Sequence, residues 1–294
     1  MIRVLSIDGG GLLGIIPATV LVYLQRQLDQ PIGKYFDLIT GTSTGGIIAL
    51  SLAKRPPVPI EKILDLYVRR GKEIFSRGFL EYLPWMFRRK YNHKNLEALL
   101  IEYLGKQPLA TCDIRVMIPA RDLIERRTIW FKSWKNGTVI PIWEVARAGS
   151  AAHTYFCAHK GQVDGGVSVN NPSACAAAEA RVIWPNEEVM VVSLGTGVST
   201  VSLGRLACEG YGKWAPYLIG EFMDGAADAV DYQMDKDPGI DYRRFQMNLA
   251  WSSDKMDDAS SKQINSLLRE TEYRIVIKQK NALDRLVEDL KRDR

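Results

Sequence analysis

Apolar residues in the first part of the chain alternate between short strand-like runs and longer runs with helical spacing. Residues 3–8 are rich in Val, Leu and Ile, which is typical of a strand buried on both faces of a parallel sheet. Glycines follow at once, and apolar residues then recur at helical spacing over residues 14–28. A second strand, predicted over residues 35–40, runs into residues 41–45, and residues 46–54 continue as an apolar helix. The chain therefore opens with two units of strand, glycine-containing loop and helix.

The rest of the chain continues this alternation. The pattern predicts further helices over 60–75, 96–104, 142–150, 173–183, 218–234 and 283–290, and strands over 115–119, 128–131, 189–194 and 242–249. Strands that alternate with helices predict an α/β fold of three layers, α/β/α, with a mostly parallel central sheet. No repeat or linker interrupts the pattern, so residues 1–294 are predicted to form a single domain.

Composition places the chain among ordinary globular proteins, with 46% hydrophobic and 25% charged residues. No apolar run reaches the ~18 residues of a membrane span, and the apolar start is too short for a signal peptide. The four cysteines are far apart and favour reduced thiols in a cytoplasmic protein. The net charge of +5 suits an anionic membrane surface or a phosphate-bearing ligand, but many proteins without such partners share it. Neither DNA nor RNA is indicated as a partner.

The motif most suggestive of catalysis is GxSxG at residues 41–45, where Ser43 is flanked by Gly41 and Thr42, and by Thr44 and Gly45. A serine forced into a sharp strand-to-helix turn exposes its hydroxyl, and the flanking glycines let neighbouring backbone pass closely. The same pentapeptide also occurs as a structural turn. The predicted strand before it and helix after it favour a nucleophile elbow.

A second glycine motif, at residues 8–14, has two interpretations. Gly9, Gly10 and Gly11 leave several backbone amides unshielded, so a developing oxyanion could approach them closely. Gly9, Gly11 and Gly14 also satisfy the GxGxxG fingerprint of dinucleotide-binding proteins. That fingerprint expects an acidic residue at the end of the second strand, which here ends in Ser43 instead.

An activated serine needs a proton acceptor, and the chain offers two kinds. The histidines His93, His153 and His159 are each consistent with a surface or capping role. Asp164 precedes Gly165 and Gly166, a sequence typical of a tight turn. An aspartate can replace histidine if it lies within hydrogen-bond reach of the serine and an apolar environment keeps it basic.

These three motifs, in this order, resemble the patatin-like phospholipase family. Residues 146–156 and 193–197 are similar to two further family segments, and residues 224–233 resemble the tail of a bacterial subgroup. The resemblance covers nearly the whole chain and implies a patatin-like fold with a small helical cap. It also implies a Ser43/Asp164 dyad with the amides of Gly9 to Gly11 as oxyanion hole, acting on membrane phospholipids without metal or cofactor.

Two positions depart from the family pattern. Leu13 stands where members commonly carry Arg or Lys, which leaves open the rate and the headgroup preference. His153 stands where members often carry proline. Neither departure touches the dyad.

Membrane contact and regulation are the last questions that the sequence raises. Residues 79–91 combine aromatic and basic side chains, which suits a bilayer interface, a cap on the core, or a lid within residues 76–92. The resemblance extends to bacterial antiphage effectors activated by cyclic oligonucleotides, which would act at the inner membrane face. A constitutive housekeeping lipase, a dinucleotide-dependent enzyme and a non-catalytic binding module remain the alternatives, and the oligomeric state stays open.

Overall fold

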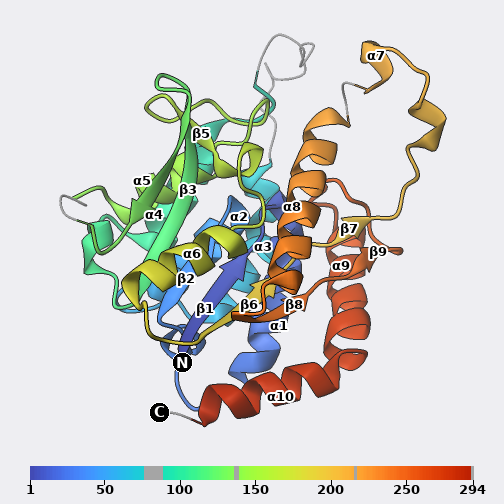
Figure 1. The fold of residues 1–294 in the computed structure, drawn as a ribbon. Helices are drawn as coiled ribbons and strands as arrows, with labels where there is room; N and C mark the ends of the chain where they lie inside the picture. Colours follow the sequence, from blue (N-terminus) through green and yellow to red (C-terminus); the bar gives the residue numbers. More distant parts are fainter. Residues whose placement is uncertain (76–88, 136–138, 215–216, 293–294) are drawn as a thin grey trace.

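A central sheet of seven strands organises the described part of the chain, which comprises residues 1–75, 89–135, 139–214 and 217–292 of a computed structural model (Figure 1). The strand order is β4-β3-β2-β1-β6-β8, and β5 pairs with β3. These strands are β1 (Ile2–Ile7), β2 (Leu38–Gly41), β3 (Arg115–Asp122), β4 (Arg127–Lys132), β5 (Gln162–Asp164), β6 (Val189–Leu194) and β8 (Ile240–Phe245). The short strands β7 (Val198–Ser199) and β9 (Asn248–Leu249) form a separate pair.

Helices cover both faces of this sheet (Figure 1). One face packs against α1 (Ile15–Gln25), α2 (Thr44–Ala53), α3 (Ile60–Ile74), α4 (His93–Leu104), α5 (Ile142–Gly149), α9 (Ser261–Thr271) and α10 (Lys280–Lys291). The other face packs against α6 (Ser173–Ile183) and α8 (Leu218–Lys236). A short helix, α7 (Tyr211–Trp214), precedes α8, and a π-helix, Glu272–Ile277, joins α9 to α10.

Alternate residues of the central strands enter the two different cores. In β1, Val4 packs into the core beneath α6 and α8, and Leu5 packs into the core beneath the other helices. Side chains of a strand point alternately to opposite faces, so a strand covered on both faces is apolar nearly throughout. The structure therefore confirms the predicted three-layer fold.

The register of the parallel strands brings their carboxyl ends to one edge of the sheet. The last residue of β1, Ile7, is level with Gly41 of β2 and with Leu194 of β6. Leu194 is in turn level with Phe245 of β8. The loops that follow these four strands therefore meet at one edge, where open α/β sheets usually bind their ligands.

Two predicted strands differ from the observed elements. Tyr35 ends a 3₁₀-helix, Ile32–Tyr35, rather than beginning a strand. The predicted strand over 242–249 is divided into β8 and β9, because the Gln246 side chain accepts a hydrogen bond from the Met247 amide at 3.0 Å and interrupts the ladder. The helix α9 was not anticipated, although Ser260 caps it by accepting from the Gln263 amide.

Most of the predicted cap segment, 76–92, lies outside the described residues, as do the aromatic residues between 79 and 87. The structure does describe residues 89–92. No helix in the described ranges is long and apolar enough to cross a membrane. All four cysteines are free thiols, of which Cys208 is exposed.

Candidate active site

Ser43 occupies a strained turn between β2 and α2. Its φ of 53° and ψ of −118° lie in a region that residues with a side chain rarely adopt. The glycines on either side are required by close backbone approach. A Cβ at Gly41 would lie 2.2 Å from the Gly45 carbonyl oxygen, and one at Gly45 would lie 2.3 Å from the carbonyl oxygen of Ile7. The turn therefore has the geometry predicted for a nucleophile elbow.

The two threonines of this motif point away from the serine and anchor the turn. The Thr42 hydroxyl donates to the carbonyl of Val169 at 2.7 Å. The Thr44 hydroxyl donates to the buried Tyr67 hydroxyl at 2.6 Å, on α3. Ser43 immediately precedes α2, so the positive end of that helix dipole lies beside its hydroxyl.

Asp164 is the last residue of β5, and its carboxylate is buried. Its backbone amide donates to the carbonyl of Ala151 at 3.1 Å, and its Oδ1 accepts from the Gly166 amide at 2.8 Å. The Ser43 side chain is its other hydrogen-bond partner. The structure thus brings together two residues that are 121 positions apart in the sequence.

Burial changes the acidity of this carboxylate. Asp164 is only 4% exposed, and desolvation raises its pKa to about 6, against the lowering effect of the bonds from Ser43 and the Gly166 amide. The carboxylate is therefore a much stronger base than an aspartate in water, and it is still ionised at neutral pH.

The glycine loop after β1 lies beside Ser43. A Cβ at Gly9 would lie 3.4 Å from the Ser43 Cβ. The Gly9 amide itself donates to the carbonyl of Asn170 at 3.2 Å, so it is not available to an oxyanion, contrary to expectation. In the described parts of the chain, the amides of Gly10 and Gly11 donate to no protein acceptor. They are the donors in this loop that have no protein partner among the described residues.

The same loop does not suit a dinucleotide. A pyrophosphate must approach a glycine loop where side chains are missing. Here protein atoms fill those places: a Cβ at Gly10 would lie 2.7 Å from the Thr196 hydroxyl, and one at Gly11 would lie 2.4 Å from the Met256 carbonyl oxygen. A Cβ at Gly14 would lie 2.3 Å from the Thr44 hydroxyl. The glycines therefore allow tight packing within the protein.

Two of the three histidines lie near a glutamate carboxylate instead of near Ser43. His93 begins α4 and lies 4.0 Å from Glu97, and His159 lies 3.7 Å from Glu144. Burial lowers the pKa of His153, and no partner is recorded for its Nδ1 in the described residues. Within the described ranges, no hydrogen bond or ion pair joins any of these three side chains to Ser43 or Asp164.

Several residues at this edge were not anticipated from the sequence. Asn170 is 5% exposed, and its Oδ1 lies 2.5 Å from the position of a Cβ at Gly9 and 3.5 Å from one at Gly166. Leu13, the departure from the family pattern, is 4% exposed and belongs to the core. Two sequence motifs could have pointed to this edge of the sheet. Asn170 begins an Asn-Asn-Pro sequence, and Thr196 lies in the Ser-Leu-Gly-Thr-Gly segment 193–197.

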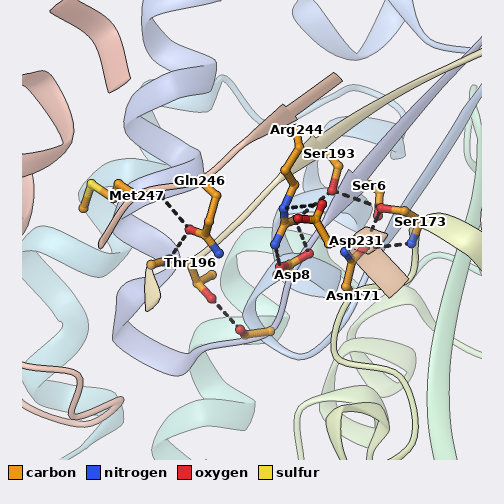
Figure 2. Close-up of polar contacts among 12 residues, drawn as sticks. Ser6, Asp8, Asn171, Ser173, Ser193, Thr196, Asp231, Arg244, Gln246 and Met247 are labelled. Carbon is orange, nitrogen blue, oxygen red and sulfur yellow. Dashed lines mark hydrogen bonds and ion pairs between the residues drawn. The ribbon is translucent and has the colours of Figure 1, made fainter. Parts of the chain in front are cut away.

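A buried polar network lies beneath the glycine loop (Figure 2). Arg244 on β8 donates to both carboxylate oxygens of Asp8, at 3.0 and 2.5 Å, and to the Ser193 hydroxyl at 2.7 Å. The Ser173 hydroxyl bonds both Ser193 and Ser6, each at 3.0 Å. Asp8 is 2% exposed, so this two-bond ion pair holds the start of the loop from below.

Comparison with known proteins identifies relatives of the chain. The family model described as patatin-like phospholipase matches residues 5–176. Patatin-like protein 2 of Oryza sativa subsp. indica is 30% identical, over 92% of this chain and 82% of its own. Patatin-like protein 3 of Arabidopsis thaliana is 28% identical, over 79% and 69%.

A bacterial relative and a solved structure complete the comparison. A protein named cGAMP-activated phospholipase, from Pseudomonas aeruginosa, is 29% identical over 91% of this chain and 82% of its own. The crystal structure of VipD from Legionella pneumophila matches with a TM-score of 0.42 and 12% identity, over 93% of this chain and 67% of that one.

The strained backbone of Ser43 predicts an unusual order of stabilities. Ser43→Gly relieves a strain of about 1–3 kcal/mol, whereas Ser43→Ala keeps it. We expect Ser43→Gly to be the more stable variant in urea unfolding, by up to about 2.5 kcal/mol once glycine's entropic cost of about 0.5–1 kcal/mol is subtracted from the strain. Ser266, inside α9, is the control, because there the alanine variant should be the more stable. The same order at both positions would contradict the strain at Ser43.

Proposed function

The chain belongs to the patatin-like phospholipase family, whose members are lipid acyl hydrolases, and from this premise we propose that Ser43 and Asp164 form its catalytic dyad. The observation that carries the proposal is the buried Asp164 carboxylate, made basic by desolvation, with the Ser43 side chain as its hydrogen-bond partner. A base of pKa about 6 is well matched to proton transfer near neutral pH. The substrates proposed are membrane phospholipids and lysophospholipids.

The reaction follows from this arrangement. Ser43 Oγ attacks the ester carbonyl carbon while its proton passes to Asp164. The negative charge that develops on the carbonyl oxygen is received by the free amides of Gly10 and Gly11. When the tetrahedral intermediate collapses, the C–O bond to the alcohol breaks, and Asp164 returns the proton to the leaving lysolipid. Water, activated by the same carboxylate, then hydrolyses the acyl-serine and releases the fatty acid.

Asp164 can serve as both base and acid because its carboxylate accepts few hydrogen bonds, so its pKa stays raised. The Gly166 amide stabilises the anion, and the Ser43 hydroxyl does so only until it transfers its proton. A carboxylate with several further donors would have too low a pKa to accept that proton. Burial therefore does the work that a histidine performs in the more familiar triads.

Regulation by a cyclic oligonucleotide in antiphage defence is a second part of the proposal. It is supported by the similarity to the protein named cGAMP-activated phospholipase, which extends over 91% of this chain. Activity without an activator, as in a housekeeping lipase, is the alternative. The names of the plant relatives mention no activator.

Access to the membrane is proposed to be peripheral, from the cytoplasmic side. The predicted contact segment, 79–91, is described only at its end, where Lys90 and Tyr91 both bind the carboxylate of Asp257. The Lys90 charge is therefore paired within the protein. Among the described residues of this segment, Arg89 is the other cation that could contact a lipid surface. Its guanidinium donates to the Cys157 sulfur at 2.9 Å.

The nucleophile is tested by covalent labelling. A fluorophosphonate probe should label the wild type and give a single adduct on the peptide that contains Ser43. Ser43→Ala should abolish the label, and Asp164→Asn should slow it by at least about 100-fold, because the general base is lost. Ser51→Ala, a buried serine on the same helix, is the matched control and should label like the wild type. A label that persists in Ser43→Ala would end the assignment.

The base is tested by the pH dependence of kcat/KM on a soluble ester. Asp164 must be ionised to accept a proton, so its raised pKa places the acid limb near pH 6 instead of near 3.8. Activity should fall about tenfold per pH unit below this limb. A histidine would titrate in the same range, so His153→Gln and His159→Gln are the controls, and both should keep the limb. A limb that disappears in either variant would reassign the base.

Regulation is tested with the purified wild type. If a cyclic oligonucleotide is the activator, phospholipid hydrolysis should be slow in its absence and should rise with one member of a panel of cyclic di- and trinucleotides. Labelling of Ser43 should rise in parallel if the ligand opens or orders the site. Full activity that no panel member changes would favour the housekeeping alternative and leave the dyad unaffected.

A further inference from the structure

The carbonyl side of the glycine loop is held by Thr196. The Thr196 hydroxyl donates to the Gly9 carbonyl oxygen at 2.7 Å, and Thr196 is 5% exposed (Figure 2). A peptide unit is planar and trans, so its C=O and N–H point in opposite directions. The bond to the Gly9 carbonyl therefore fixes where the Gly10 N–H points. That amide is one of the two proposed oxyanion donors.

Thr196 is itself held by Gln246, which follows β8. Gln246 Oε1 accepts from the Gly197 amide at 2.8 Å and from the Met247 amide at 3.0 Å (Figure 2). Its side chain also packs closely over Gly195, where a Cβ would lie 2.3 Å from the Gln246 Cδ. Both residues next to Thr196 thus contact one side chain, which holds the backbone on either side of the threonine.

Arg244 fixes the same loop from its other end. Its two-bond ion pair with Asp8 holds the residue that precedes Gly9. Arg244 and Gln246 are two positions apart, so their side chains lie on the same side of the strand and its extension. They hold the first loop and the loop that carries Thr196 together.

A third contact comes from residues 250–256. The Met256 carbonyl accepts from the Leu12 amide at 2.7 Å. The segment before it is ordered by Glu270, which is fully buried and accepts from the amides of Ala250 and Ser252 at 2.7 and 3.0 Å. All of these supports lie beyond residue 176, where the match to the family model ends.

We propose that Thr196 is a positioning residue that directs the Gly10 amide toward the oxyanion, with Arg244 and Gln246 holding the two loops in place. The proposal rests on the proposed role of Ser43. Thr196 lies behind the loop and acts through it, without touching substrate. Its effect should therefore fall on the transition state and spare the binding of the ground state.

The test compares Thr196→Val with Thr196→Ser. Valine keeps the shape but removes the donor, whereas serine keeps the donor. Because loss of an oxyanion-hole donor costs roughly 100- to 1000-fold in kcat, a misdirected donor should cost about 10- to 100-fold, with KM unchanged. Thr196→Ser should stay close to wild type. The affinity for a trifluoromethyl ketone analogue should fall in parallel with kcat, and the affinity for a non-hydrolysable ether phospholipid should not change.

The pH profile of Thr196→Val distinguishes a positioning role from a general disturbance of the site. The acid limb near pH 6 should be the same in wild type and Thr196→Val, because Asp164 is unaffected. If Thr196→Val does not fold, Gln246→Met should show the same loss of kcat with unchanged KM. Wild-type kcat and ketone affinity in Thr196→Val would overturn the proposal, as would equal losses in the valine and serine variants.

The strand supplies a matched control for Arg244. Its neighbour Arg243 also pairs with carboxylates, those of Asp241 and Asp289, and among the described residues it has no hydrogen bond or ion pair to the glycine loop. Arg244→Met should lower kcat and ketone affinity together, and Arg243→Met should change neither. Equal effects of the two variants would overturn the role of Arg244. A wild type that lacks esterase activity and Ser43 labelling, both alone and with every member of the cyclic nucleotide panel, would instead refute the proposed function on which this inference rests.

Discussion

Close backbone contact at the carboxyl edge of the sheet is the constraint on which the rest of the site depends. β1 and β2 end level with each other, and the residue two positions after Ser43 can only be glycine, because the end of β1 occupies the space of a side chain. This contact forces the serine into its strained turn. It also brings the glycine loop, which continues from β1, directly beside the serine. One register of two parallel strands thus places the proposed nucleophile next to the unpaired amides.

The second requirement is a carboxylate kept away from water. Asp164 reaches the serine from β5, which pairs antiparallel with β3 at the far side of β2. Its backbone amide donates to Ala151 and its Oδ1 accepts from the Gly166 amide, and these bonds hold the side chain in a buried position. Desolvation raises the free energy of the anion, and in the proposed mechanism this cost is what makes the carboxylate basic enough to act without histidine. Strain in the serine turn and desolvation of the carboxylate are two costs of the same site.

The sequence predicted the layers and the Ser43 turn because both depend on local signals, whereas the role of Asp164 was implied only by the resemblance to the family. Strand, glycine turn and helix can be recognised within about fifteen residues around Ser43. The partners of the glycine loop could not be found in this way. Thr196, Arg244 and Met256 reach it from positions 187 or more residues beyond Gly9. The segment of Thr196 resembles a family segment, but this resemblance does not say which residues Thr196 contacts. The engaged amide of Gly9 was missed for the same reason, because its acceptor, Asn170, belongs to a distant turn.

The contacts that β8 and the following loop make with the glycine loop determine how much of the chain is needed to form the site. A fragment trimmed after α6 would carry the serine, the aspartate and all of the first glycines, yet it would lack the side chains that brace those glycines from beneath. For the same reason, a transfer of the Ser43 turn and the glycine loop into another α/β scaffold would also need the side chains that correspond to Arg244 and Gln246. Esterase designs that borrow this site need the distal strand as much as the serine turn.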